Sequence, residues 1–130
     1  MTSLESSSDE IPELAELAIY ETQIDEELLD EQPFGIIRLD SSGRILNYNL
    51  YEEKLARRSR EEVVGKNFFF EVAPCTKVRK FYGRFLDGVE RRSLKATFSF
   101  NFAFAHGDRK VEITLLYRSV DDSVWVIVRG

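Results

Sequence analysis

The most regular pattern in the chain is an alternation of apolar and polar residues over positions 94–106. One side of this alternation consists of Leu94, Ala96, Phe98, Phe100, Phe102, Phe104 and His106. A period of two predicts a β-strand with one buried face, which is here mostly phenylalanine. Shorter alternating or apolar runs predict four more strands, at residues 35–39, 45–49, 111–117 and 124–128. Turn residues lie between strands at positions 40–43, 107–108 and 121–122.

A second spacing, that of an α-helix, follows residue 76. The apolar residues at i, i+3, i+4, i+7, i+8 and i+11 are Val78, Phe81, Tyr82, Phe85, Leu86 and Val89. Thr76 is a suitable N-cap residue, so we expect one helix to begin there. Residues 50–73 contain shorter helical pieces, one of which starts at the capping box of Ser59 and Glu62 and ends at Gly65.

The first 33 residues form a different kind of segment, acidic and with thin apolar stripes. Residues 11–20 predict a short helix, and Ile24 and Leu28 predict a second helical turn that Pro33 closes. Two such short helices need a surface to lie on. The order strand–strand–helices–strand–strand–strand over residues 34–130 predicts an α+β domain with an antiparallel sheet and helices on one face.

Composition limits the class of protein. The 130 residues are 43% hydrophobic and suffice for one domain with its own core. A single cysteine excludes an internal disulfide, and a single histidine excludes a zinc site built on several histidines. The longest apolar run, residues 124–128, is too short to cross a bilayer. The first basic residue is Arg38, so no signal peptide is expected, and we predict a cytoplasmic protein without membrane or metal.

Charge is distributed unevenly along the chain. Residues 1–37 contain eleven Asp and Glu and no Lys or Arg, whereas the rest contains 12 acidic and 18 basic residues. The acidic flank either serves solubility or docks on the more basic body and is released by a signal. Basic clusters at residues 57–60 and 91–92 fit a solvated face better than a nucleic-acid surface, because the chain has a net charge of −5.

Three residues are candidates for chemistry. Cys75 precedes the predicted helix, whose positive end would favour a reactive thiolate, although a buried structural cysteine is the alternative. Tyr48 and Glu52 are four residues apart. If a helix begins after Asn49, both side chains reach one point, where a phenol and a protonated carboxyl suit a buried anionic oxygen. A thiol enzyme based on Cys75 and His106 stays open, but no residue is obviously placed to orient the imidazole.

Several motifs give the chain a resemblance to a known family. They are Phe34-Gly35, Ile45-Leu46-Asn47-Tyr48-Asn49, Gly65-Lys66-Asn67-Phe68-Phe69, Val72-Ala73-Pro74-Cys75-Thr76, Phe81-Tyr82-Gly83-Arg84-Phe85 and Trp125-Val126. With Tyr48 and Glu52, they resemble the photoactive yellow protein family from Phe34 to nearly the end of the chain. The segment 1–33 is similar to that family's helical cap only in kind.

The resemblance implies a PAS-type fold with a five-stranded antiparallel sheet and an N-terminal helical cap, residues 1–33, on a photosensor core, residues 34–130. It also implies p-coumaric (4-hydroxycinnamic) acid joined to Cys75 as a thioester. Tyr48 and Glu52 would donate hydrogen bonds to its phenolate oxygen, and Arg58 would gate the pocket. The expected lining residues are Ile37, Phe68, Val72, Ala73, Thr76, Phe102 and Phe104.

Four positions depart from the family pattern, and two of them, Phe100 and Val124, each replace a tyrosine and should not affect the chemistry. Ala56 replaces a threonine that usually supports the tyrosine, so the absorption spectrum is expected to differ. His106 replaces a methionine linked to fast thermal recovery, so we expect slower recovery with a pH dependence set by the imidazole.

The resulting hypothesis is a blue-light receptor that is not an enzyme. Light would isomerise the pigment, Glu52 would give up its proton, and the N-terminal cap would be released toward a signalling partner that the sequence does not identify. The alternative is a PAS module that binds another ligand or a protein without a covalent pigment.

Overall fold

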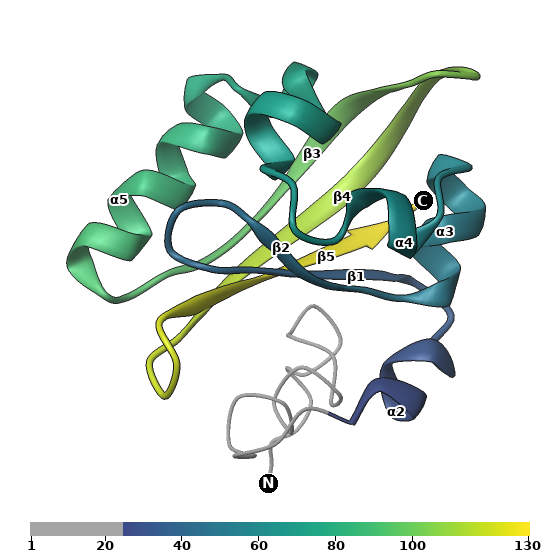
Figure 1. The fold of residues 1–130 in the computed structure, drawn as a ribbon. Helices are drawn as coiled ribbons and strands as arrows, with labels where there is room; N and C mark the ends of the chain where they lie inside the picture. The colour runs from purple at the N-terminus through teal and green to yellow at the C-terminus, as the bar shows by residue number, and fades with distance from the viewer. Residues whose placement is uncertain (1–24) are drawn as a thin grey trace, which may run out of the picture.

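The computed structural model describes residues 25–130, which form one five-stranded antiparallel sheet in the order β2-β1-β5-β4-β3 (Figure 1). The strands are β1 (Gly35–Leu39), β2 (Ile45–Tyr48), β3 (Lys95–Phe104), β4 (Gly107–Arg118) and β5 (Ser123–Arg129). The helical elements are α2 (Glu26–Asp30), α3 (Leu50–Ala56), α4 (Arg60–Val63), η2 (Phe68–Val72), η3 (Pro74–Thr76), η4 (Arg79–Gly83) and α5 (Arg84–Arg91). The predicted α+β class, with an antiparallel sheet, is confirmed.

The alternating phenylalanines predicted the long strand β3 and its buried face. Phe98, Phe100, Phe102 and Phe104 are all less than 10% exposed. The predicted turn after this strand is wrong by two residues. Phe104 pairs with Gly107 inside the ladder, so the two-residue loop consists of Ala105 and His106 rather than residues 107–108. Burial of the aromatic face fixes this register, and a two-residue loop is the commonest hairpin connection.

The single helix predicted from Thr76 is also wrong. Val78 has an extended backbone (φ −134°, ψ 163°) that separates the 3-10 turn η3 from the π-helix η4, and α5 begins only at Arg84. The Thr76 hydroxyl donates to the Ala73 carbonyl at 2.6 Å and caps no helix. Val78 and Leu86, which the predicted single helix would place on its apolar face, are both exposed.

The two faces of the sheet are covered differently. The larger hydrophobic core lies between one face and the elements α3 to α5 and is rich in aromatic rings. Phe81 lies near its centre, with ring centroids 5.3 Å from Phe100 and 5.5 Å from Phe98. On the opposite face a smaller cluster joins Leu29 of α2 to Trp125 of β5, and Figure 1 shows α2 on that side.

The N-terminal expectations are tested only in part. The second helical turn exists as α2, capped by Asp25, whose side chain accepts hydrogen bonds from the Glu27 and Leu28 amides. Leu29, not Leu28, is its fully buried residue. The predicted helix 11–20 and Ile24 lie outside the described residues.

Candidate functional site

Tyr48 and Glu52 meet at the junction between β2 and α3. Asn49 is the N-cap of α3, and its Oδ1 accepts hydrogen bonds from the Glu52 amide (3.1 Å) and the Ile36 amide (2.9 Å). An asparagine at the N-cap starts the helix immediately after the strand. The first turn of α3 therefore carries the Glu52 side chain inward, where it is 1% exposed, and the helical turn after Asn49 is as expected.

The Glu52 carboxyl is buried, and within the described part of the chain one of its two oxygens makes no hydrogen bond that would offset the loss of hydration. Its Oε1 has no hydrogen-bond partner among residues 25–130. Burial raises the pKa of Glu52 to about 8, because the charged form loses its hydration in an apolar site. At neutral pH this carboxyl is therefore mostly protonated and able to donate a hydrogen bond.

Tyr48 is the second polar group at this site and is 3% exposed. Burial, and then the nearby Glu52 carboxyl, raise the pKa of the Tyr48 phenol, while Arg58 opposes the rise. The phenol therefore keeps its proton at neutral pH and is available as a donor. Tyr48 and Glu52 together present two neutral donors to one space.

That space is a cavity of about 220 Å³. Its lining residues are Tyr48, Glu52, Ala56, Arg58, Phe68, Val72, Ala73, Phe102, Ala103, Phe104 and Ala105. Drug-sized ligands take roughly 300–1,000 Å³, so this cavity suits a smaller molecule such as one with a single ring. Apolar walls with a few convergent polar groups are typical of a small-molecule site.

Arg58 lies at the exposed margin of this cavity. Its guanidinium donates to the Val72 carbonyl (3.0 Å) and to the Glu62 carboxylate (2.9 Å). Its side chain is 27% exposed, so it connects the cavity to solvent and ties α4 to η2. The Arg58 contact also lowers the pKa of the exposed Glu62 carboxyl.

Cys75 lies in the short turn η3, directly after the lining residue Ala73. It is half-buried, carries a free thiol and packs against the large aromatic core. The expected contact with a helix start is absent, because the extended Val78 separates η3 from η4. Thr76 and Ile37 are fully buried, and like Cys75 they are not among the residues that line the cavity.

His106 lies outside this cavity, in the β3–β4 loop. Its ring stacks on Phe104, with centroids 5.3 Å apart and planes inclined by 16°. It borders a separate polar cavity with Lys54, Arg57 and Arg109. His106 is therefore next to two lining residues, Phe104 and Ala105, without lining the cavity itself. Among residues 25–130, no hydrogen bond joins His106 to Cys75.

Sequence reasoning missed three residues of the site. Ala103 and Ala105 line the cavity where β3 ends, beyond the reach of a strict two-residue alternation. Gly35 lies against Glu52: a Cβ on Gly35 would overlap Oε1 and lie 3.2 Å from Cδ. The glycine in Phe34-Gly35 was the available signal, since a glycine inside a strand often marks a close approach.

Residues 25–130 hold no cluster of His, Cys, Asp and Glu suited to a metal ion. Among the same residues, no helix combines the length and the apolar character that a bilayer crossing requires.

The chain is similar to proteins of known class. Its sequence matches the PAS fold family over residues 23–128. It is 43% identical over 101 residues to a photoactive yellow protein of Halochromatium salexigens, covering 78% of this chain and 81% of the relative. A photoactive yellow protein of Rhodothalassium salexigens is 41% identical over 101 residues, with the same two coverages.

Solved structures agree with the sequence relatives. The photoactive yellow protein domain of the sensor histidine kinase Ppr from Rhodospirillum centenum has a TM-score of 0.79 and 42% identity, covering 82% of this chain and 94% of that chain. A PAS domain of an HTR-like protein from Haloarcula marismortui, with 20% identity and a TM-score of 0.64, shares the fold.

Proposed function

The chain belongs to the photoactive yellow protein family of PAS domains, and from that premise we propose that it is a blue-light receptor with p-coumaric acid joined to Cys75. It is a sensor domain rather than an enzyme. The observation that carries the proposal is the buried Glu52 carboxyl, whose Oε1 lacks a partner at the cavity that Tyr48 also lines.

The residues present fit this pigment. A phenolate in an apolar cavity is costly unless strong hydrogen bonds hold it, and Tyr48 and neutral Glu52 supply two donors. Cys75 would supply the thioester sulfur, and its half-buried position leaves the thiol within reach of an activated acid. The thiol adds to the activated carbonyl carbon, the activating group departs, and the thiol proton leaves with it. We propose the aromatic and small residues of the cavity, with Ile37 and Thr76 beneath them, as packing for the ring.

When bound, the pigment supplies absorption of blue light and a trans double bond that light isomerises. Before illumination Glu52 would hold a proton on its carboxyl oxygen, because burial raises its pKa to about 8, and it would be the residue that gives a proton to the phenolate afterwards. The carboxylate left behind is buried without a partner, at a cost of roughly 3–5 kcal/mol. This cost is comparable to the stability of a small domain, so local opening follows.

Asn49 gives that opening a route to the N-terminal cap. Its Nδ2 donates to the Leu29 carbonyl (2.8 Å) and the Phe34 carbonyl (3.0 Å), while its Oδ1 holds the Glu52 amide. Movement of the first turn of α3 therefore loosens α2. We propose residues 1–33 as the cap whose release is passed to a signalling partner, in line with the kinase that contains the Rhodospirillum centenum domain.

Two lining or neighbouring residues tune the response. Ala56 offers no hydroxyl to Tyr48, so the phenol is held less firmly than in relatives with threonine. We propose that His106 acts on the pocket through its stacking on Phe104. Protonation of its imidazole would then change the rate of thermal recovery after illumination. Substitution of His106 by Met should accelerate recovery and abolish its pH dependence; an unchanged pH profile would remove His106 from the account.

The test is to add an activated p-coumarate to the purified chain and record intact mass and visible absorption. We expect one adduct per chain and a yellow product, and neither with Cys75→Ser. In the loaded protein, Glu52→Gln should shift the absorption to the red, whereas Glu53→Gln, next to it but paired with Arg60, should leave the spectrum unchanged. Failure to form the adduct would favour a PAS module for a non-covalent ligand.

A further inference from the structure

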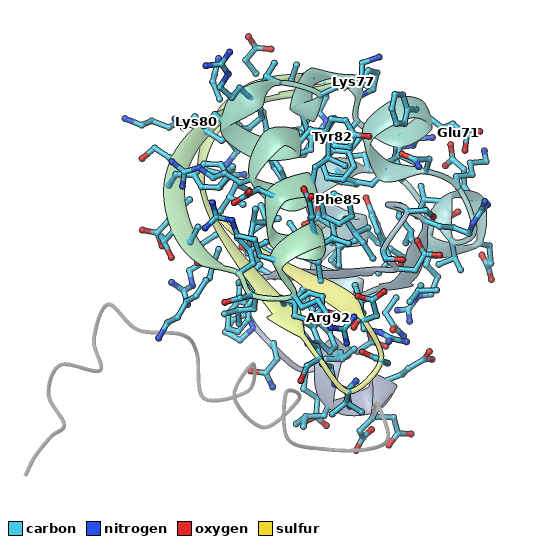
Figure 2. All side chains as sticks on the ribbon, turned by 90° about the vertical axis from the view of Figure 1, so that its left-hand side faces the viewer. Glu71, Lys77, Lys80, Tyr82, Phe85 and Arg92 are labelled. Atoms are coloured by element: carbon cyan, nitrogen blue, oxygen red, sulfur yellow. The ribbon has the colours of Figure 1, made fainter. Side chains whose placement is uncertain are left out.

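The residues directly after η3, the turn that contains Cys75, carry several basic side chains and no acidic ones. We define the basic ridge as Lys77, Arg79, Lys80 and Arg84, which are all exposed. Residues 77–86 contain no acidic side chain. Figure 2 looks onto this side of the molecule, with Lys77 and Lys80 at the upper end of the helical stretch and Arg92 at its lower end.

The ridge differs from the basic residues at the C-terminal end of α5. Arg91 pairs with Asp87, and Arg92 with Asp122. Within residues 25–130, none of the four ridge side chains forms an ion pair. Their charges are therefore available to an external acidic group, while those at the end of α5 are already neutralised.

Aromatic rings hold three of the ridge cations. The Lys80 Nζ lies 5.7 Å and the Arg84 Cζ 4.7 Å from the centroid of Phe98. Lys77 Nζ lies 4.6 Å from the centroid of Phe70. Two cations therefore lie beside one ring of β3, where a single anionic group could interact with both.

Exposed apolar side chains border the ridge. Phe70, Val78 and Leu86 are 50%, 46% and 47% exposed, and they are three of the six large hydrophobic residues that are exposed in residues 25–130. Positive charges next to apolar side chains make a surface of mixed character, as interface cores and their rims do.

We propose that the basic ridge, with Val78 and Leu86, is the docking surface for an acidic segment of a partner protein that also presents apolar side chains. A nucleic acid or an anionic bilayer fits less well, because this chain has a net charge of −5 and residues 1–37 alone carry eleven carboxylates without a base. The surface lies outside the pigment cavity, so the proposal goes beyond the photoreceptor function and does not require it.

The experiment measures fluorescence anisotropy of a labelled synthetic peptide, three repeats of Glu-Glu-Leu-Leu, with the full chain both unloaded and pigment-loaded in the dark. We expect saturable binding that weakens as salt is raised. The triple substitution Lys77→Glu, Lys80→Glu and Arg84→Glu should weaken binding by about tenfold or more. The matched control, Lys54→Glu, Arg109→Glu and Lys110→Glu, makes the same change of charge at exposed residues away from the ridge.

Each outcome decides the proposal. Equal weakening by the two triple variants, or no binding by the wild-type chain, would overturn it. Tighter ridge-dependent binding to a poly-dT oligonucleotide or to phosphatidylserine vesicles would assign the surface to another occupant. A ridge-dependent dimer in sedimentation would assign it to a second copy of the chain. The milder variant Lys77→Gln, Lys80→Gln and Arg84→Gln, checked by circular dichroism, separates lost binding from lost folding.

Discussion

The two faces of the sheet are stabilised in different ways. The face toward the pocket is covered by a large aromatic core, in which Phe81 is completely buried. The opposite face has a five-residue cluster, and α2 is held there mainly through polar groups. Its contacts are Asn47 to Glu26 (3.0 Å), Asn49 to the Leu29 carbonyl (2.8 Å), the Leu50 amide to Asp30 (2.9 Å) and Arg60 to Asp30 (3.0 Å).

This difference indicates which part moves. Many aromatic rings are buried together in the larger core, so we expect that core to open only when the domain unfolds. A short helix on a few hydrogen bonds detaches at a smaller cost, and its attachment includes Asn49, the same residue that positions Glu52. The Asn49 side chain therefore links α2, through the Leu29 carbonyl, to the backbone of the residue that carries the unpartnered carboxyl.

Truncation of a buried side chain should lower the free energy of unfolding much more on the pocket face of the sheet than on the α2 face. Phe81→Ala removes a ring that contacts Phe98 and Phe100 and should lower the free energy of unfolding by ~3–5 kcal/mol. Leu29→Ala should cost less globally, because only α2 detaches. Urea unfolding measures the first effect, and hydrogen exchange at residues 26–32 measures the second. Equal global losses would contradict the comparison.

The buried carboxyl should give the unloaded chain a distinctive pH dependence. Because folding raises the pKa of Glu52 from 4.5 to about 8, the folded state binds more protons than the unfolded state between these values. The contribution is fully present below pH 4.5 and is lost as pH rises to 8, with a slope of up to ~1.4 kcal/mol per pH unit. Urea unfolding at several pH values should show this fall in the wild-type chain and not in Glu52→Gln.

The close approach of Gly35 to Glu52 should make the site intolerant of one methyl group. Gly35→Ala places a Cβ against Oε1 and should destabilise the unloaded chain by ~1–3 kcal/mol while displacing the carboxyl. Gly83→Ala is the control, since its Cβ would meet only the flexible Arg79 side chain at 3.3 Å. Chemical denaturation measures both, and a harmless Gly35→Ala would show that the Glu52 carboxyl lies elsewhere.

The smallest expected effect concerns the ion pair that attaches α2. A double-mutant cycle with Arg60→Ala and Asp30→Ala should give a coupling of ~0.5–1 kcal/mol, because both side chains are about one third exposed. The Arg91–Asp87 pair, with both side chains more than half exposed, serves as the comparison and should give less. A larger coupling at Arg91–Asp87 would contradict the view that α2 is held by its polar contacts.

The sequence predicted those features that depend on local periodicity. Alternation identified β3 and its buried phenylalanines, and residue chemistry identified the Ser59 cap, whose hydroxyl accepts from the Glu62 amide at 3.2 Å. The motifs also pointed to Tyr48, Glu52 and the aromatic side chains that now line one cavity. The roles of those residues toward a pigment stay predictions.

What escaped prediction depends on tertiary context. Helical spacing in residues 78–89 gave no sign that Val78 is extended or that η4 is a π-helix, because apolar spacing alone does not show where a regular α-helix is interrupted. The position of the β3–β4 turn follows from strand register rather than from the Gly107-Asp108 pair. The contact of Gly35 with Glu52 joins residues 17 positions apart, which no local pattern reveals.

The account depends on a neutral Glu52 that gives up its proton on illumination, and light-minus-dark infrared spectroscopy of the pigment-loaded protein tests this directly. We expect illumination to remove the C=O band of a protonated buried carboxyl and to produce a carboxylate band, with both changes absent in Glu52→Gln. A spectrum without a carboxyl change, or one that persists in Glu52→Gln, would contradict the account.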